Sequence, residues 1–307
     1  MKIYIRIFIA VMIASVILSS CEDVIHPELQ KAEPVLVVEA WLNNKPGDQV
    51  INLMKTQSYF DNTTPPGVSG AIVTVQDSEG EVMTFTEDVN QKGSYRWSPS
   101  VAGGSFGTIG RDYKLTVVVG GETFVSVSSM GRVPVIDSIT FKFEEKSSFY
   151  PKNSYTAEFW ARDPQGTGDT YWIRTTKNDT LLNKPQEISL AFDAGFSQGG
   201  SFDGITFIPP IRTSINPNNT DSNKKPLSPY SPGDSVYVEI QSISIATFNY
   251  LNEVAIQTNR PGGFGQLFSA PPSNVSTNVF NSNEKGSKVV GFFNTAAVSG
   301  LGKRLKK

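Results

Sequence analysis

The chain has 307 residues, with 27 Lys and Arg against 29 Asp and Glu, and it contains a single His and a single Cys. One cysteine cannot form an intramolecular disulfide, and one cysteine with one histidine cannot build the usual zinc sites. The formal net charge of −2 lacks the basic excess that is typical of nucleic-acid-binding proteins. We therefore expect neither a disulfide scaffold nor a nucleic-acid binder.

Residues 1–20 differ in composition from the rest of the chain. Lys2 and Arg6 supply positive charge, and the apolar run Ile7–Leu18 is shorter than the roughly 20 residues that a membrane-spanning helix needs. This pattern predicts a signal peptide over residues 1–20. The tetrapeptide Leu18-Ser-Ser-Cys21 resembles a bacterial lipobox, whose cysteine is lipid-modified and becomes the new amino terminus. An ordinary secretory signal with an incidental cysteine is the alternative.

Cys21 is thus the expected lipidation site, carrying palmitate or related acyl chains, and residues 21–34 are expected to form a lipidated tether. No later segment approaches about 18 apolar residues, so lipid is the only membrane anchor that the sequence predicts. Glu22 and Asp23 resemble the export signal that sends Bacteroidota lipoproteins to the cell surface. A solvated linker is the alternative interpretation of these two acidic residues.

Short β-branched segments, bounded by Gly, Pro, Asn or Asp, predict strands from Val35 onward. They are Val35–Ala40, Gln49–Met54, Ala71–Val75, Glu81–Thr86, Ser94–Trp97, Tyr113–Val119 and Thr123–Val127. The sequence Asp77-Ser-Glu-Gly80 predicts a tight turn between the third and fourth of these segments. About seven strands at this spacing are typical of a β-sandwich, so we expect an immunoglobulin-like or transthyretin-like sandwich domain over residues 35–131.

Gly131 and Pro134 break any strand that would cross them, so we place a domain boundary there. Residues 132–302 are expected to form a larger β-rich domain, with long loops in the Asn- and Pro-rich stretch 178–232. Its predicted strands are Asp137–Glu145, Tyr155–Arg162, Tyr171–Thr176 and Ser235–Ile240.

The apolar period changes to that of a helix near residues 244–259, with Ser244 as a possible cap and Pro261-Gly-Gly263 as a stop. We expect this single helix to pack on the sheet; a partner-binding face is the alternative. The basic end, residues 303–307, is expected to be a frayed, solvated tail. Contact with anionic lipopolysaccharide or a partner is the other interpretation of that tail.

Few residues offer catalytic chemistry. His26 lies in the predicted tether, so a Ser/His/Asp triad is not expected, and Cys21 is used by lipidation. Glu144 and Glu145 are adjacent and point to opposite faces of a strand, which does not suit a catalytic pair. We therefore expect no catalytic residue, no cofactor and no enzymatic activity.

Some loops carry groups that are worth weighing as ligand sites. Asp163 and Asp169 bracket a Pro- and Gly-containing loop that could hold calcium, but the ligand density is low and a turn is favoured, with no metal site. The Gly-rich segments 103–107 and 262–265 do not lie between a strand and a helix, so they predict turns rather than phosphate cradles. Aromatic residues near loops are either ligand platforms or core residues: Trp41, Tyr59, Phe60, Phe149 and Tyr150.

The order of several motifs resembles the Bacteroidota outer-membrane lipoproteins gathered as domain of unknown function 4249. After the lipobox come Pro34-Val-Leu-Val-Val-Glu39, Val68–Val75, Gly93-Ser-Tyr95, Val133-Pro-Val-Ile-Asp137, Asp163-Pro-Gln-Gly166, Tyr171-Trp172, Pro272-Ser-Asn-Val275 and Gly291-Phe-Phe293. The segment Gly67–Trp97 also resembles a transthyretin-like or carboxypeptidase-regulatory-like β-sandwich. The Asn- and Pro-rich insert near 214–232 departs from the family pattern.

The resemblance implies an outer-membrane, cell-surface lipoprotein. Because such proteins are often encoded beside TonB-dependent receptors, it further implies an accessory or ligand-capturing partner of a TonB-dependent β-barrel transporter. It brings no catalytic residues. A surface adhesin or glycan-binding β-sandwich protein is the alternative function. The expected partners are therefore the membrane, through the lipid on Cys21, and a β-barrel receptor, but no nucleic acid.

Overall fold

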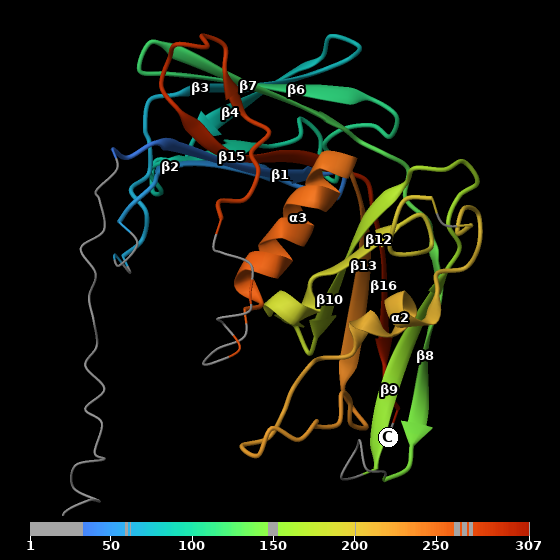
Figure 1. Ribbon diagram of the computed structural model, residues 1–307. Helices are drawn as coiled ribbons and strands as arrows, with labels where there is room; N and C mark the ends of the chain where they lie inside the picture. Colours follow the sequence, from blue (N-terminus) through green and yellow to red (C-terminus); the bar gives the residue numbers. More distant parts are fainter. Residues whose placement is uncertain are drawn as a thin grey trace, which may run out of the picture. The chain divides into compact units, whose positions relative to one another are not determined.

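The computed structural model describes residues 33–306 except 59, 60, 62, 147–152, 200, 261–264, 266–268 and 270–272. Residues 34–307 form a single compact unit, distinct from residues 1–33. The predicted signal peptide, Cys21 and His26 lie outside the described residues, as do Tyr59, Phe60, Phe149, Tyr150 and the predicted helix stop at 261–263. The described chain is mostly β, as the sequence predicted (Figure 1).

A nine-stranded sheet occupies one region of the molecule (Figure 1). Its strands, in spatial order, are β14 (Phe280–Asn281), β7 (Glu122–Ser129), β6 (Asp112–Val119), β3 (Ile72–Asp77), β4 (Val82–Glu87), β5 (Ser94–Trp97), β2 (Gln49–Lys55), β1 (Leu36–Asn43) and β15 (Val289–Ala296). All neighbours are antiparallel except β1 and β15, which run parallel. The backbone N–H of Thr295 in β15 donates to Ser128 Oγ in β7 at 2.9 Å. Because β15 thus also contacts β7, the sheet curls until it is nearly closed.

The strands alternate as half-buried strands should, with every second side chain turned inward. In β1 the buried residues are Leu36, Val38, Ala40 and Leu42. They pack with alternate residues of the other strands around Tyr95, whose side chain is fully buried. Gly291 in β15 has a positive φ of 122°, and a Cβ there would lie 2.0 Å from the carbonyl oxygen of Val38. Only glycine therefore permits this close parallel pairing.

The second region contains two smaller sheets with a common core. One holds β11 (Thr180–Leu181), β10 (Thr170–Lys177), β13 (Ser235–Ile243) and β16 (Val298–Arg304) in that order, with β12 (Ser189–Phe192) also paired to β10. The other pairs β8 (Ile136–Glu144) with β9 (Ser154–Ala161). Apolar residues of both sheets bury one another, including Phe159 from β9 and Ile240 from β13. The two sheets therefore face each other across one hydrophobic layer.

The predicted helix near 244–259 is confirmed as α3, Ile245–Thr258 (Figure 1). Ser244 is its N-cap, and the Ser244 Oγ accepts a hydrogen bond from the Thr247 backbone N–H at 3.1 Å. Thr247 and Leu251 are its buried residues, and α3 contacts β10 and β12. The helix thus packs on the sheet, as its apolar stripe predicted.

The expectation of one helix was incomplete, because the stretch 178–232 is not only loop. Besides β11 and β12 it forms the short helices η1 (Pro185–Glu187), α2 (Pro209–Arg212) and η2 (Thr213–Ile215). Pro209 and Pro210 open α2, where proline suits the first helical turn because the N–H that it lacks would be unpaired there. The prolines that suggested loops thus begin a helix here.

The end of the chain also differs from the predicted frayed tail. β16 continues through Arg304, and Leu305 is buried at 8% exposure. The ammonium group of Lys303 donates to the Ile139 carbonyl oxygen at 2.5 Å. The predicted division at 131/132 stays a prediction; the structure adds that β14 and β15, which follow it in sequence, belong to the nine-stranded sheet.

Candidate functional site

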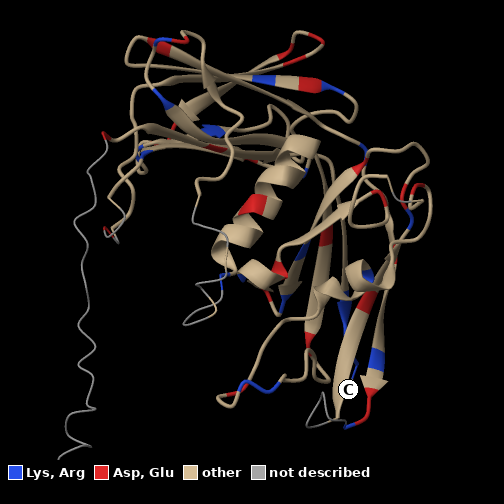
Figure 2. Ribbon diagram, in the orientation of Figure 1, with Lys and Arg blue, Asp and Glu red and all other residues tan. Residues whose placement is uncertain are grey.

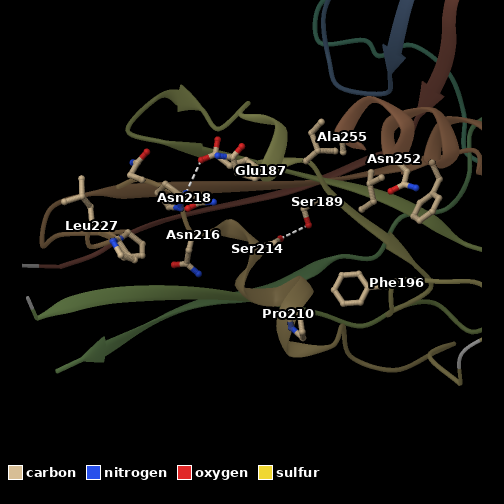
Figure 3. Close-up of a pocket in the computed structure, with 18 residues that line it drawn as sticks. Glu187, Ser189, Phe196, Pro210, Ser214, Asn216, Asn218, Leu227, Asn252 and Ala255 are labelled. Carbon is tan, nitrogen blue, oxygen red and sulfur yellow. Dashed lines mark hydrogen bonds between the residues drawn. The ribbon is translucent and has the colours of Figure 1, made fainter. Parts of the chain in front are cut away.

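A groove of about 610 Å³ opens in the second region of the molecule (Figure 3). Its walls come from η1 and β12 on one side, from α2, η2 and the segment 216–229 on another, and from one face of α3. Phe248, Asn252 and Ala255 of α3 line it because residues four and three positions apart share a helix face. This volume lies within the roughly 300–1,000 Å³ that is usual for small-molecule sites.

Apolar side chains form much of the groove surface. Phe196 is 55% exposed and Leu227 is 46% exposed, so neither is held in the core. Phe248 is half-buried and its ring meets Phe192 edge-on at 6.1 Å between centroids. Large apolar groups that stay exposed in a concave place are typical of binding surfaces.

Polar groups in the groove divide into those that hold its shape and those that are free. The Asn216 side chain accepts from the Ala157 backbone N–H at 2.8 Å and donates to the Ala157 carbonyl oxygen at 2.9 Å. The hydroxyls of Ser189 and Ser214 bond to each other at 2.8 Å (Figure 3). Among the described residues, by contrast, no hydrogen-bond partner reaches the side-chain amides of Gln186, Asn218 and Asn252.

The groove offers almost no charge. Glu187 is its one ionisable lining residue among those described, and the Glu187 side chain is only 4% exposed. Its carboxylate accepts the backbone N–H of Lys184 at 2.9 Å and that of Asn218 at 3.1 Å, so it fixes the two backbone segments together. Helix α3 carries one charged residue, Glu253, which accepts from the Ser276 backbone N–H at 2.7 Å (Figure 2). The lining therefore mixes apolar and polar side chains and is effectively neutral.

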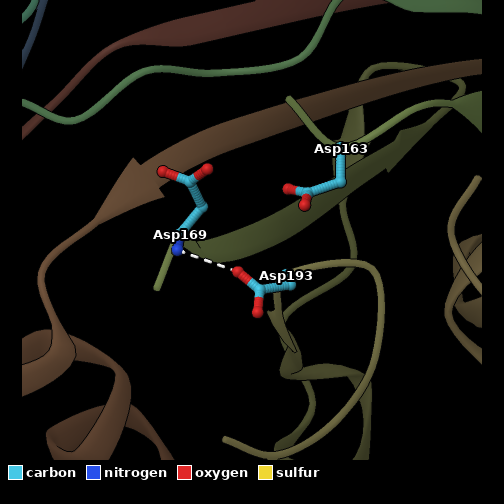
Figure 4. A group of neighbouring side chains, drawn as sticks. All are labelled: Asp163, Asp169 and Asp193. Atoms are coloured by element: carbon cyan, nitrogen blue, oxygen red, sulfur yellow. Dashed lines mark hydrogen bonds between the residues drawn. The ribbon is translucent and has the colours of Figure 1, made fainter. Parts of the chain in front are cut away.

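Asp163 and Asp169, the acidic pair weighed in the sequence, do come together, and Asp193 joins them (Figure 4). Carboxylate oxygens of the three residues lie within 4.8 Å of one another. Each is already bonded: Asp163 accepts from the Tyr171 hydroxyl at 2.6 Å, and Asp193 accepts from the Gly168 backbone N–H at 2.8 Å. Asp169 receives the Nε–H of Arg132 at 2.9 Å.

Arg132 supplies the positive charge at this acidic cluster. Its guanidinium also donates to the carbonyl oxygens of Gln165, at 2.6 Å, and Gly166. Burial raises the pKa of the Asp163 carboxyl, and burial together with the bond to Asp163 raises the pKa of Tyr171. The hydroxyl proton thus stays on Tyr171 and is shared with Asp163. With these partners the loop 163–169 is a closed turn that is tied to the segment before β8.

The remaining residues that the sequence suggested as ligand or catalytic sites contribute to packing or to surface ion pairs. Trp41 packs against Trp172 at 5.7 Å, Tyr250 at 6.0 Å and Phe292 at 6.0 Å between ring centroids. It therefore joins β1, β10, β15 and α3 rather than forming an open platform. Glu144 pairs with Lys142 on β8 at 2.9 Å, and Glu145 lies beyond the strand's end, so the two glutamates form no pair.

Sequence reasoning missed the groove. Gln186, Phe196 and Asn218 lie in the Asn- and Pro-rich stretch 178–232 that the sequence assigned to loops, and Asn252 lies on the predicted helix. The available signal was Phe196 itself, a large aromatic residue that lies between Gly195 and Ser197. Asp193 was missed because a turn with a positive φ of 48° brings it beside Asp163 and Asp169 from a distant part of the chain.

Comparison with protein families gives one decisive match. The model of the domain of unknown function DUF4249 matches residues 22–300, most of the chain. The protein belongs to the DUF4249 family. This confirms the resemblance that the order of motifs predicted. A comparison of this DUF4249 chain with curated proteins finds no match. Among its described residues, no helix combines the length and the apolar character that are needed to cross a membrane.

Proposed function

We propose that this DUF4249 protein is a non-catalytic, lipid-anchored lipoprotein of the outer membrane that captures a ligand at the cell surface. The observation that carries the proposal is the groove, which combines exposed apolar side chains with free amides and holds no available ionisable group among its described lining residues. General acid–base or nucleophilic chemistry needs a titratable or activated side chain within reach of the substrate. The groove is suited to binding rather than to reaction.

The membrane anchor and the partner in this proposal come from the sequence. The lipobox-like Leu18–Cys21 motif supports lipidation of Cys21. The accessory role beside a TonB-dependent transporter is what the resemblance in the order of sequence motifs implies. In that role the lipoprotein holds its ligand near the mouth of the β-barrel. The local concentration of ligand at the transporter then rises without any new chemistry.

Co-purification tests the partnership. The full chain would carry a carboxyl-terminal tag, membranes would be solubilised in a mild detergent, and co-purifying β-barrel proteins would be identified by mass spectrometry. A TonB-dependent transporter in stoichiometric amount is the expected result. A Cys21→Ala variant, which loses the predicted lipid site, is expected to leave the membrane fraction and lose the partner.

Loss of the gene should then reduce uptake through that transporter. A lone protein that purifies without a β-barrel, together with unchanged uptake after gene deletion, would contradict the accessory role. The same groove would then favour the alternative, a surface adhesin or glycan-binding protein. Cell-attachment assays with and without the lipoprotein distinguish that function.

A further inference from the structure

We propose that the groove of this protein binds a neutral oligosaccharide. The inference rests on the proposed function, because it names the class of ligand that the same groove captures. Three features of the lining carry it: its lack of available charge, its free amide groups, and its exposed ring of Phe196.

The first feature selects a neutral ligand. Removing an ionised group from water is costly unless a partner of opposite charge receives it. Glu187 cannot serve a cationic ligand, because its side chain is 4% exposed and bonds to two backbone N–H groups. No Lys or Arg is among the described lining residues. Lys184 stands beside the groove, but its ammonium group is already engaged: it lies 4.0 Å from the Glu187 carboxylate and donates to the Asn218 carbonyl oxygen and to the Asn219 side chain. An anionic ligand would therefore have to displace these partners. Phosphates, uronic acids and free amino acids are therefore disfavoured.

The second feature selects a ligand rich in hydroxyl groups. Gln186, Asn218 and Asn252 come from η1, from the segment after η2 and from α3, so they line the groove from different walls. Figure 3 shows Asn218 and Asn252 on two of these walls. Each side-chain amide offers two N–H donors and a carbonyl acceptor. A ligand that satisfies all three must donate and accept at several separate points. Sugar hydroxyls do both, whereas a hydrocarbon ligand would leave the amides unpaired at a cost.

The third feature supplies an apolar contact for the faces of sugar rings. Phe196 is 55% exposed, and no ring contact among the described residues holds it in a core. Aromatic rings bury large areas against flat apolar partners, and the C–H face of a pyranose ring is such a partner. Exposed aromatic and free amide groups in one uncharged groove fit a sugar chain better than they fit either a lipid or an ion.

Isothermal titration of the full chain with defined trisaccharides tests the proposal. The protein would be kept in a polyoxyethylene-ether detergent, because glycoside detergents would compete for the groove. The neutral probes are maltotriose, cellotriose, xylotriose, mannotriose and N,N′,N″-triacetylchitotriose; the acidic probe is trigalacturonate, and the peptide probes are blocked tripeptides. We expect at least one neutral trisaccharide to bind measurably and the acidic one to bind at least 10-fold more weakly.

Matched variants place the binding in the groove. Phe196→Ala and Asn252→Ala should each weaken binding of the trisaccharide about 10-fold, the factor for a loss of about 1.4 kcal/mol. Their controls carry the same change outside the groove: Phe280→Ala, whose side chain is 59% exposed, and Asn249→Ala, which is exposed on α3. Both controls should bind like the wild type. All four positions are exposed or half-exposed, so the variants are expected to fold.

Each other outcome of the titrations overturns the inference. Binding that is the same in the groove and control variants would place the sugar elsewhere. Failure of all the neutral sugars to bind, or stronger binding of trigalacturonate, would reject a neutral oligosaccharide. Blocked tripeptides that bind and lose affinity in Phe196→Ala would assign the groove to peptides and leave the ligand-capturing function intact. Loss of the transporter partner in co-purification would instead reject the proposed function alone.

Discussion

Both regions of this molecule are built from β-strands, but the segments that connect the strands differ between them. In the nine-stranded sheet, Gly120-Gly121 connects β6 to β7 and residues 98–111 connect β5 to β6, in both cases without a helix. In the second region, residues 182–234 connect β11 to β13, and this segment contains β12, which pairs with β10, and the short helices η1, α2 and η2. That excursion frames the groove. Binding sites commonly lie on such connecting segments, held by a rigid scaffold.

The first region also supports one wall of the groove. Tyr250 of α3 stacks on Phe292 of β15, with 4.3 Å between ring centroids. Lys45, beyond β1, pairs with the buried Glu239 of β13 at 2.7 Å. Because α3 lies against a strand of the nearly closed sheet, the face that carries Asn252 is fixed by packing on its other side. The nine-stranded sheet thus acts as a scaffold, and the second region carries the groove.

The largest expected effect comes from emptying the scaffold core at β15. Phe293 is fully buried, so Phe293→Ala should lower the free energy of unfolding by about 3–5 kcal/mol. Phe280→Ala in the same sheet should change it by only about 0.5 kcal/mol or less, because that ring is 59% exposed. Urea denaturation measures both. Similar losses in the two variants would mean that β15 does not complete the core.

Removing the Arg132 side chain from the acidic cluster should have the next largest effect on the free energy of unfolding. Arg132→Ala leaves Asp169 without its charge partner and two carbonyl oxygens without a donor, at a cost of roughly 1–2 kcal/mol, since the side chain is 42% exposed. Lys142→Ala removes a pair on a side chain that is 72% exposed and should cost about 0.5 kcal/mol or less. Thermal and urea unfolding compare them. Equal stability of both variants would show that the loop 163–169 is held by other contacts.

The groove wall should respond to its helix cap. Ser244→Ala removes the acceptor for the Thr247 backbone N–H and should destabilise the protein by about 1 kcal/mol. Ser244→Asp keeps an acceptor at the cap and should stay close to the wild type. Hydrogen exchange of the first-turn amides of α3 should rise in the alanine variant. Unchanged exchange there would contradict the capping role.

The smallest expected effect is a pH dependence at Asp163. Burial raises the pKa of its carboxyl above the ordinary value of about 3.8, so the folded state favours the protonated form. Its contribution to stability is therefore fully present below pH 3.8 and is lost as the pH rises through the folded-state pKa. The difference in the free energy of unfolding between the wild type and Asp163→Asn should therefore favour the wild type more at pH 3.5 than at pH 7. Urea denaturation at the two pH values measures this difference. The opposite sign would mean that the Tyr171 bond outweighs burial.

The sequence by itself was sufficient for the elements with a strong local period. The alternation at Val73 and Val75 predicted a strand, and the capped apolar stripe after Ser244 predicted a helix. Both predictions were possible because each element buries one face, which leaves a periodic pattern in the sequence. Family membership also followed from the order of short motifs. These features depend on neighbours that are close in sequence, so they can be read without the fold.

Tertiary structure alone decided the rest. The pairing of β1 with β15 joins residues more than two hundred positions apart, and it depends on a backbone approach that only Gly291 allows. The meeting of Asp193 with Asp163 and Asp169 has no local signal, because Asp193 lies in a separate turn 24 residues after Asp169. The groove likewise brings Gln186, Asn218 and Asn252 together from elements that share no periodicity. Long-range chain geometry, rather than local propensity, sets the positions of such groups.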